Sequence, residues 1–119
     1  MIAEAEQLKA YATDWSKVAI DRPSDGIERQ MVVGENMMMC RFRFEPYLVT
    51  PAHSHPHEQM TLIISGRANF VIGDQECIVS AGDVLHFPPN CWHGATMLDT
   101  EVVLIDIFSP IRADFLDDK

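Results

Sequence analysis

The sequence has little positive charge and no long apolar run, and each absence excludes a class of protein. Nine lysines and arginines stand against eighteen aspartates and glutamates, which gives a formal net charge of -9. Nucleic-acid binding requires basic side chains that replace the counterions of the phosphates, so we exclude it. No apolar stretch is long enough to cross a bilayer, and we expect no membrane partner.

The sequence also lacks the cysteines of a disulfide framework. It has three, Cys40, Cys77 and Cys91, and an odd number without paired spacing favours free thiols in a reducing compartment. The first residues lack the basic start and apolar run of a signal peptide. We therefore expect a cytoplasmic protein.

The length and composition predict one globular domain. A chain of 119 residues with 47% hydrophobic residues is long enough to enclose one core without disulfides. We expect a single domain over residues 1–119, with its core at about residues 26–109. The helix formers between Ala3 and Ala12 predict a short N-terminal helical segment.

Beyond that segment the chain alternates between short β-forming runs and turn residues. This pattern indicates an all-β sandwich or barrel rather than a helical or mixed fold. The expected strands are Gly26–Val33, Asn36–Phe44, Met60–Ser65, Ala68–Ile72, Glu76–Ser80, Val84–Phe87 and Val102–Phe108.

The alternation from Met38 to Phe44 puts apolar side chains on one face of its strand and two arginines on the other. Arg41 and Arg43 then either form part of a solvated face or line an anion-binding interior. The alternation alone favours the solvated face. The sequence leaves their individual roles open, together with that of Arg29.

Four of the five histidines gather in two segments that can form a metal site. His53 and His55 share one face of an extended strand, and Gln59 has the same parity. His93 can complete the site from a neighbouring strand, and imidazole nitrogens suit transition metals. His57 is a competing ligand, and a loose surface tract of histidines is the alternative interpretation.

The spacing of these residues resembles the two sequence motifs of the cupin superfamily. The first motif is represented by His53, His55, Gln59 and Gly66, and the second by Gly82, Pro88, Asn90, His93 and Met97. The resemblance implies an all-β single-domain cupin, which is a double-stranded β-helix or jelly-roll barrel. It also implies one divalent metal ion held by His53, His55, Gln59 and His93, with His57 at the site edge or exposed.

Three residues depart from the cupin pattern. Gln59 replaces a glutamate, Asn90 replaces a glycine, and Met97 replaces an asparagine. Asparagine tolerates left-handed turns, so Asn90 is compatible with the fold. A neutral ligand set leaves the full +2 charge of the ion, which makes it a stronger Lewis acid. Nickel, zinc, manganese, iron and cobalt all suit such ligands.

Asp106 stands in the middle of the most strongly β-forming segment of the chain. Val, Leu, Ile and Phe surround it, and a buried carboxylate is unfavourable unless it is paired or ligated. A structural aspartate that is satisfied by backbone groups or by an arginine is one interpretation. A functional acid is the other.

The segments His53–Gln59 and Asp106–Phe115 together resemble one cupin subgroup, the pectin- and alginate-degradation cupins. These convert 4,5-unsaturated uronate monosaccharides to the linear keto form. The resemblance extends from about Trp15 to Leu116. It implies that Asp106 is the catalytic acid and base, that Phe108 shapes the substrate pocket, and that Arg112 binds the substrate carboxylate.

Two other functions remain as alternatives to this uronate enzyme. One is a metal-dependent dioxygenase, which Gln59 disfavours because such sites usually include an acid. The other is a non-catalytic cupin that binds a small molecule, for which a buried Asp106 has no evident use. A small anionic sugar is the expected partner, and a homodimer that covers an open sheet edge is the expected assembly.

Overall fold

The apolar alternation of the sequence produces strands along most of residues 10–116, the part of the chain that the computed structural model describes. A 3-10 turn, η1 (Trp15–Lys17), precedes the strands, and a short helix, α1 (Ala113–Leu116), follows them. The strands are β1 (Asp21–Ser24), β2 (Ile27–Val33), β3 (Met38–Phe44), β4 (Val49–His53), β5 (Glu58–Ser65), β6 (Arg67–Ile72), β7 (Gln75–Ser80), β8 (Val84–Phe87), β9 (His93–Met97) and β10 (Val102–Ser109).

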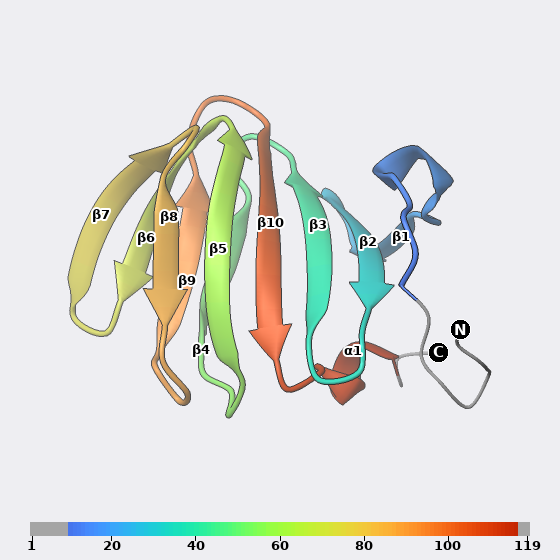
Figure 1. The fold of residues 1–119 in the computed structure, drawn as a ribbon. Helices are drawn as coiled ribbons and strands as arrows, with labels where there is room; N and C mark the ends of the chain where they lie inside the picture. Colours follow the sequence, from blue (N-terminus) through green and yellow to red (C-terminus); the bar gives the residue numbers. More distant parts are fainter. Residues whose placement is uncertain (1–9, 117–119) are drawn as a thin grey trace.

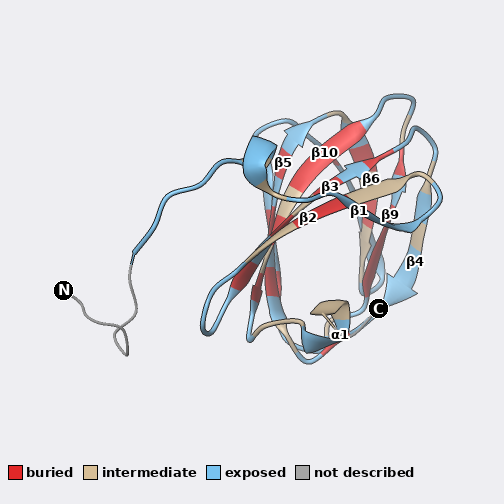
Figure 2. Cartoon of the chain, turned by 90° about the vertical axis from the view of Figure 1, so that its right-hand side faces the viewer, coloured by how far each residue is buried: buried red, intermediate tan, exposed pale blue. Residues whose placement is uncertain are grey.

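These strands form two antiparallel sheets that face each other. The larger sheet has the order β1-β2-β3-β10-β5-β8, and the smaller has the order β4-β9-β6-β7. Figure 1 looks onto the outer face of the larger sheet, and Figure 2 shows the two sheets as opposite walls whose buried residues line the space between them. This architecture confirms the expected all-β jelly-roll barrel.

The inward side chains of β3 illustrate how the core forms. Arg41 and Arg43 lie on the outer face, which confirms the solvated interpretation over an anion-binding interior. Arg43 contacts Glu101 and Glu28 there. The opposite face of the strand is buried in the hydrophobic core through Met38, Cys40, Phe42 and Phe44, as the alternation predicted.

Three strands are absent from the strand ranges predicted from β-forming runs, and each contains a residue that weakens a β signal. Pro23 lies in β1, Pro51 in β4 and Gly94 in β9. All three strands are held by pairing with a neighbour, so tertiary contacts override the local preference. Most of the predicted N-terminal helix falls outside the described residues, and its last three positions, 10–12, are not helical.

None of the helices within residues 10–116 has the length and apolar character that a membrane span requires.

Gly66 makes the tight turn between β5 and β6 and cannot carry a side chain. Its φ of 86° lies in the left-handed region, and a Cβ at this position would overlap the carbonyl oxygen of Glu101. Gly73 also has a positive φ, of 60°, but nothing lies within 4 Å of the position of its missing Cβ. Asn90 has a φ of 68°, which agrees with the expected tolerance of asparagine there.

This difference between the two glycines predicts a difference in stability. Gly66→Ala should lower the free energy of unfolding by about 3 kcal/mol, because backbone strain and a backbone clash act together. Gly73→Ala is the control, and it should lose only about 1 kcal/mol from the strain alone. Urea denaturation followed by circular dichroism measures both, and equal losses would show that the clash at Gly66 is relieved at little cost.

Candidate metal centre and its cavity

A cavity of about 250 Å³ lies between the two sheets and is lined by all of the predicted site residues except His55. Its walls are mostly apolar, with a few polar groups directed inward, as is usual for small-molecule sites. Its polar lining consists of Arg29, Thr50, His53, Gln59, His93, Asp106 and Arg112.

Three histidines from different segments lie close together, and two of them, His53 and His93, line this cavity. His53 ends β4 and His93 begins β9, and the two are paired across the sheet. His55 follows in the connection to β5, so the expectation that it shares an extended strand with His53 is wrong. One ring nitrogen from each lies within 4.8 Å of the others. His55 and His93 are buried, whereas His53 is exposed.

Backbone carbonyl groups orient all three imidazole rings. The Nδ1 atoms of His53, His55 and His93 lie 2.9, 3.1 and 2.8 Å from the carbonyl oxygens of Pro51, His57 and Cys91. A carbonyl oxygen can only accept, so each Nδ1 carries the proton in the neutral ring. Each Nε2 therefore keeps its lone pair for a ligand, which is the usual outer-sphere arrangement of metal-binding histidines.

His55 and Gln59 present two acceptor atoms to each other. His55 Nε2 lies 3.0 Å from Gln59 Oε1, and the single proton of the neutral ring is already at Nδ1. A second ring proton would satisfy both contacts. Burial, followed by the charge of Arg112, opposes that proton by lowering the pKa of His55 to about 4. At neutral pH a cation shared by these two atoms would relieve the repulsion between their lone pairs.

The amide of Gln59 is oriented by its other hydrogen bonds. Its Nε2 donates to Thr61 Oγ1 at 3.0 Å and to Asp106 Oδ1 at 3.2 Å. Since the nitrogen is directed to these acceptors, Oε1 is directed to His55. His57 lies outside the three-histidine group, and burial lowers its pKa.

Three imidazoles thus lie close together, and one amide oxygen contacts one of them, His55. This donor set fits a divalent transition metal ion. The three histidines are placed to hold one, and Gln59 lies beside them as the fourth predicted ligand.

Asp106 is buried on the inner face of β10, directly opposite Thr61 of β5. Thr61 Oγ1 donates to Asp106 Oδ1 at 2.6 Å, and Gln59 provides the second hydrogen bond. Burial raises the pKa of Asp106 to about 7, although both hydrogen bonds and the charge of Arg112 oppose this rise. A carboxyl group in this state can take up or release a proton near neutral pH.

Arg112 lies at the same cavity between two aromatic rings. Its guanidinium carbon is 5.1 Å from the ring centre of Phe108 and 4.2 Å from that of Phe115. Its Nε and Nη2 atoms donate to the carboxylate of Asp114 at 3.0 and 2.8 Å. These contacts fix the side chain, and Nη1 has no hydrogen-bond partner among the residues that the structure describes.

Three polar residues of the site were not assigned from the sequence: Thr50 and Arg29, which line the cavity, and Thr61, which contacts Gln59 and Asp106. Thr61 connects Gln59 to Asp106, but a single threonine in an apolar strand has no distinctive signal, except that its parity matches that of Gln59. Arg29 is buried in the cavity wall, where Asp21 accepts two of its hydrogen bonds at 3.1 and 2.9 Å. Its role could not be assigned from the sequence.

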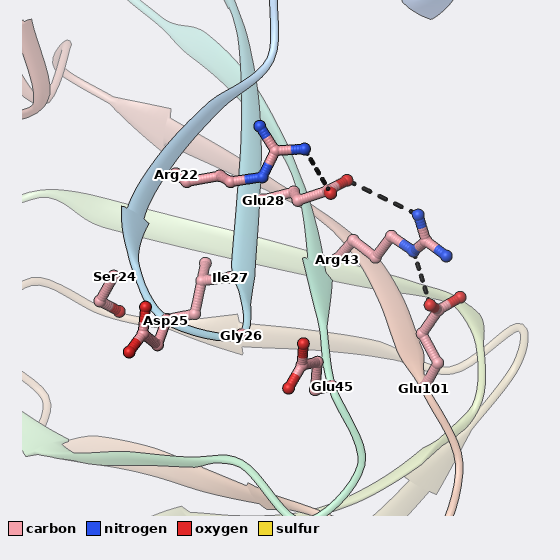
Figure 3. Close-up of a pocket in the computed structure, with 9 residues that line it drawn as sticks. All are labelled: Arg22, Ser24, Asp25, Gly26, Ile27, Glu28, Arg43, Glu45 and Glu101. Carbon is pink, nitrogen blue, oxygen red and sulfur yellow. Dashed lines mark hydrogen bonds and ion pairs between the residues drawn. The ribbon is translucent and has the colours of Figure 1, made fainter.

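A larger hollow of about 410 Å³ lies beside the turn between β1 and β2 and is less suited to chemistry (Figure 3). Its charged side chains pair with one another: Arg22 contacts Glu28, and Arg43 contacts both Glu28 and Glu101. Most of these side chains are exposed to solvent. The smaller cavity with the histidines is therefore the candidate functional site.

Comparisons with known proteins identify the family of the chain. Residues 40–108 match the family model of the cupin domain. The pectin degradation protein KdgF of Dickeya dadantii (strain 3937) is 33% identical over 106 residues, which cover 87% of this chain and 92% of that protein.

Two solved structures extend the likeness to the fold. An RmlC-like cupin from Shewanella frigidimarina NCIMB 400 has a TM-score of 0.83 and 28% identity, over 90% of this chain and 96% of that one. KdgF from Halomonas sp. has a TM-score of 0.85 and 24% identity, over 90% and 99% of the two chains. At that identity, the Halomonas likeness concerns the fold alone.

The geometry predicts an order of importance among the ligands. His53→Ala, His55→Ala and His93→Ala should each weaken metal binding by more than about 100-fold, because each removes a directed nitrogen. Gln59→Ala should weaken it by about tenfold, since a neutral amide oxygen is the poorest donor. Isothermal titration calorimetry with Zn²⁺ and Ni²⁺ measures these affinities.

Two further histidines serve as controls in that series. His57→Ala should bind metal like the wild type, and so should His86→Ala, whose ring pairs with Glu58 on the outer surface. If His57→Ala abolishes binding while Gln59→Ala does not, then His57 is the fourth ligand and the assignment of Gln59 is wrong.

Proposed function

The chain belongs to the cupin domain family, and from this premise we propose that it is a metal-dependent enzyme that linearises 4,5-unsaturated uronate monosaccharides. One observation carries the proposal: the buried carboxyl of Asp106 faces the same cavity as His53, His93 and Arg112, with a pKa of about 7. The 33% identical relative named as a pectin degradation protein supports this substrate class.

The proposed reaction is an isomerisation that needs neither water nor an oxidant. In the cyclic substrate the ring oxygen joins C1 to C5, and C4 and C5 form an enol ether. The C1 hydroxyl loses its proton, the bond between C1 and the ring oxygen breaks, and C1 becomes an aldehyde. A proton adds to C4, and C5 becomes a ketone. One proton leaves oxygen and one joins carbon, so the atoms balance.

Asp106 is the residue that we assign to both proton transfers. Its ionised carboxylate accepts the proton of the C1 hydroxyl, and the resulting acid returns a proton to C4. The raised pKa suits a group that must act in turn as base and acid at neutral pH. Thr61 and Gln59 hold the carboxylate in place through hydrogen bonds to Oδ1, which leaves Oδ2 for the substrate.

The metal held by His53, His55, Gln59 and His93 would polarise a ring or hydroxyl oxygen of the bound sugar. Because the four donors are neutral, the site keeps a net charge of about +2, which also favours an anionic substrate. Gln59 is in contact both with the metal ligand His55 and with Asp106, so it positions the two halves of the site relative to each other.

Arg112 is assigned to the carboxylate of the sugar. Asp114 and the rings of Phe108 and Phe115 hold its guanidinium at the cavity wall, where Nη1 remains available to an oxygen of the substrate. Phe108 also contacts the ring of His55 and gives the cavity an apolar wall. This wall excludes water from the reacting carbon.

Replacement of Asp106 distinguishes this enzyme from a binding protein. Asp106→Asn keeps the shape of the side chain but cannot transfer a proton, so turnover of an unsaturated uronate should fall by about 10²–10⁴-fold. Metal content and substrate affinity should stay near the wild-type values. The control Asp74→Asn, in an exposed turn, should retain full activity.

The pH profile adds a second readout to the same variant. The wild-type rate should fall below about pH 7, because Asp106 takes up a proton and ceases to act as a base. A bound divalent cation favours the ionised carboxylate and so shifts this fall in rate to lower pH. Full activity in a metal-loaded Asp106→Asn protein would return Asp106 to a structural role. Turnover that requires oxygen would favour the dioxygenase instead.

Arg112→Lys tests the assignment of the substrate carboxylate. Lysine keeps the charge but not the planar set of donors, so the Michaelis constant should rise by about tenfold while the turnover number changes little. The melting temperature should change only slightly, because the pair with Asp114 is partly exposed. A large loss of stability with normal kinetics would make Arg112 a structural partner of Asp114.

A further inference from the structure

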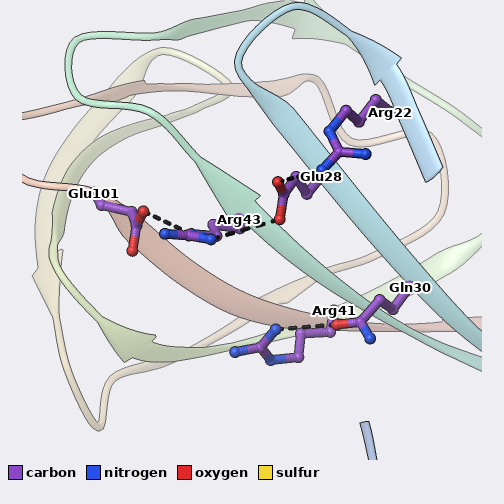
Figure 4. Close-up of polar contacts among 6 residues, drawn as sticks. All are labelled: Arg22, Glu28, Gln30, Arg41, Arg43 and Glu101. Carbon is purple, nitrogen blue, oxygen red and sulfur yellow. Dashed lines mark hydrogen bonds and ion pairs between the residues drawn. The ribbon is translucent and has the colours of Figure 1, made fainter. Parts of the chain in front are cut away.

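One strand of the smaller sheet departs from regular alternation at the metal site. In a regular strand, side chains two residues apart lie on the same face. Arg41 and Arg43 follow this rule on the outer face of β3, where Figure 4 shows their polar contacts. Thr50 and His53 of β4 are three residues apart, yet both line the cavity. An odd separation on one face requires an extra residue in the strand between them.

The pairing of β4 with β9 locates this extra residue. Thr50 is paired with Ala95, and His53 is paired with His93. Two residues of β4 therefore lie between these pairs, whereas β9 contributes only one, and this arrangement is a β-bulge. If the ladder continued from Thr50 without the bulge, Ala52 would lie opposite His93, and His53 would lie on the outer face. The bulge is thus what turns the His53 side chain into the cavity.

The residues around the bulge are suited to this backbone. Gly94 lies opposite the two extra positions, and a Cβ there would lie 2.8 Å from the carbonyl oxygen of Thr50 and 2.9 Å from the backbone nitrogen of Ala52. Pro51 has no N–H group, so it leaves no donor unpaired where the ladder is interrupted. Its carbonyl oxygen accepts a hydrogen bond from Nδ1 of His53 at 2.9 Å. The bulge therefore directs the His53 side chain and also orients its ring.

The hydroxyl group of Thr50 holds the two strands together beside the bulge. Its Oγ1 accepts a hydrogen bond from the backbone N–H of Ala95 at 3.0 Å and donates to the carbonyl oxygen of the same residue at 3.3 Å. One side chain thus binds both backbone polar groups of the residue opposite, at the last pair before the ladder is interrupted. A valine at this position would have almost the same shape but could make neither hydrogen bond.

We propose that Thr50 is a positioning residue for the metal ligand His53, because its two hydrogen bonds to Ala95 hold the bulge that directs the His53 ring to the site. This role rests on the metal site of the proposed function, but not on the uronate reaction. His55 and His93 are oriented by carbonyl groups outside the bulge. Loss of the Thr50 hydroxyl should therefore misplace one nitrogen donor and leave the other two in position.

Metal affinity tests this proposal with matched variants of the full chain. Thr50→Val should weaken Zn²⁺ and Ni²⁺ binding in isothermal titration calorimetry by about 10–100-fold, the usual effect of losing a group that orients a ligand. Thr50→Ala removes the same hydroxyl without adding a methyl group against the strand, and it should give the same loss. Thr50→Ser keeps the hydroxyl and should restore wild-type affinity. The control Thr96→Val makes the same change on the exposed face of β9 and should also bind like the wild type.

A double variant separates positioning from a general loss of stability. If Thr50 acts through His53, then adding Thr50→Val to His53→Ala should weaken metal binding by less than about twofold more, because the ring that Thr50 positions is already gone. Unchanged circular dichroism verifies that the variants fold. Wild-type affinity in both Thr50→Val and Thr50→Ala would overturn the proposal, and so would a full further loss of about 10–100-fold in the double variant.

Nuclear magnetic resonance of the histidine rings tests the positioning without a metal. In the metal-free wild type at about pH 8, where imidazoles are neutral, His53 should carry its proton at Nδ1, because the Pro51 carbonyl oxygen accepts it. The nitrogen-15 shifts of the two ring nitrogens report this tautomer, and His53→Ala assigns the signals. Thr50→Val should lose the preference for Nδ1–H, whereas Thr50→Ser should keep it.

This second readout distinguishes the failure of the two proposals. A wild type that binds no metal would contradict the proposed function, but the tautomer of His53 would still decide the role of Thr50. The same Nδ1–H tautomer in the wild type and in Thr50→Val would overturn that role, whether or not the protein binds an ion.

Discussion

The hydrogen bonds that hold the buried carboxyl of Asp106 connect the two parts of the candidate site. Asp106 lies among apolar side chains of β10, where burial disfavours its charge and raises its pKa to about 7. Thr61 and Gln59 hold the carboxyl from the neighbouring strand, and Gln59 reaches the ring of His55 with its other end. One glutamine therefore links the group that can transfer a proton to the group that can bind a metal. A glutamate at this position would place a second carboxylate beside Asp106 and remove that donor.

The histidines depend on the fold in a comparable way. Each Nδ1 is directed to a carbonyl oxygen two residues away in the chain, so local backbone conformation fixes the ring before any ligand arrives. The pairing of β4 with β9 then brings His53 against His93. Gly94 is needed at this point, because a Cβ there would lie 2.8 Å from the carbonyl oxygen of Thr50.

Much of this arrangement could be predicted from the sequence, because it follows from side-chain alternation and motif spacing. Alternation placed Asp106 and Phe108 on the inner face and Arg41 and Arg43 on the outer one, and spacing brought His93 to the other histidines. Thr61 could not be found, since its role depends on lying directly opposite Asp106, 45 residues away. Separation along the sequence also decides whether the acidic partners of Arg43 and Arg112 could be predicted. Asp114 is two residues from Arg112, whereas Glu101 is 58 residues from Arg43 and is reached only through the pairing of β3 with β10.

We propose that metal binding at the histidines and the protonation of Asp106 are coupled, because Gln59 contacts both His55 and Asp106. Isothermal titration calorimetry of Zn²⁺ binding from about pH 5.5 to about pH 8.5, in buffers of different ionisation enthalpy, measures the protons released per ion. The wild type should release up to about one proton more than Asp106→Asn near and below pH 7, and its affinity should rise more steeply with pH. Equal proton release and parallel affinity curves for the two proteins would contradict the coupling.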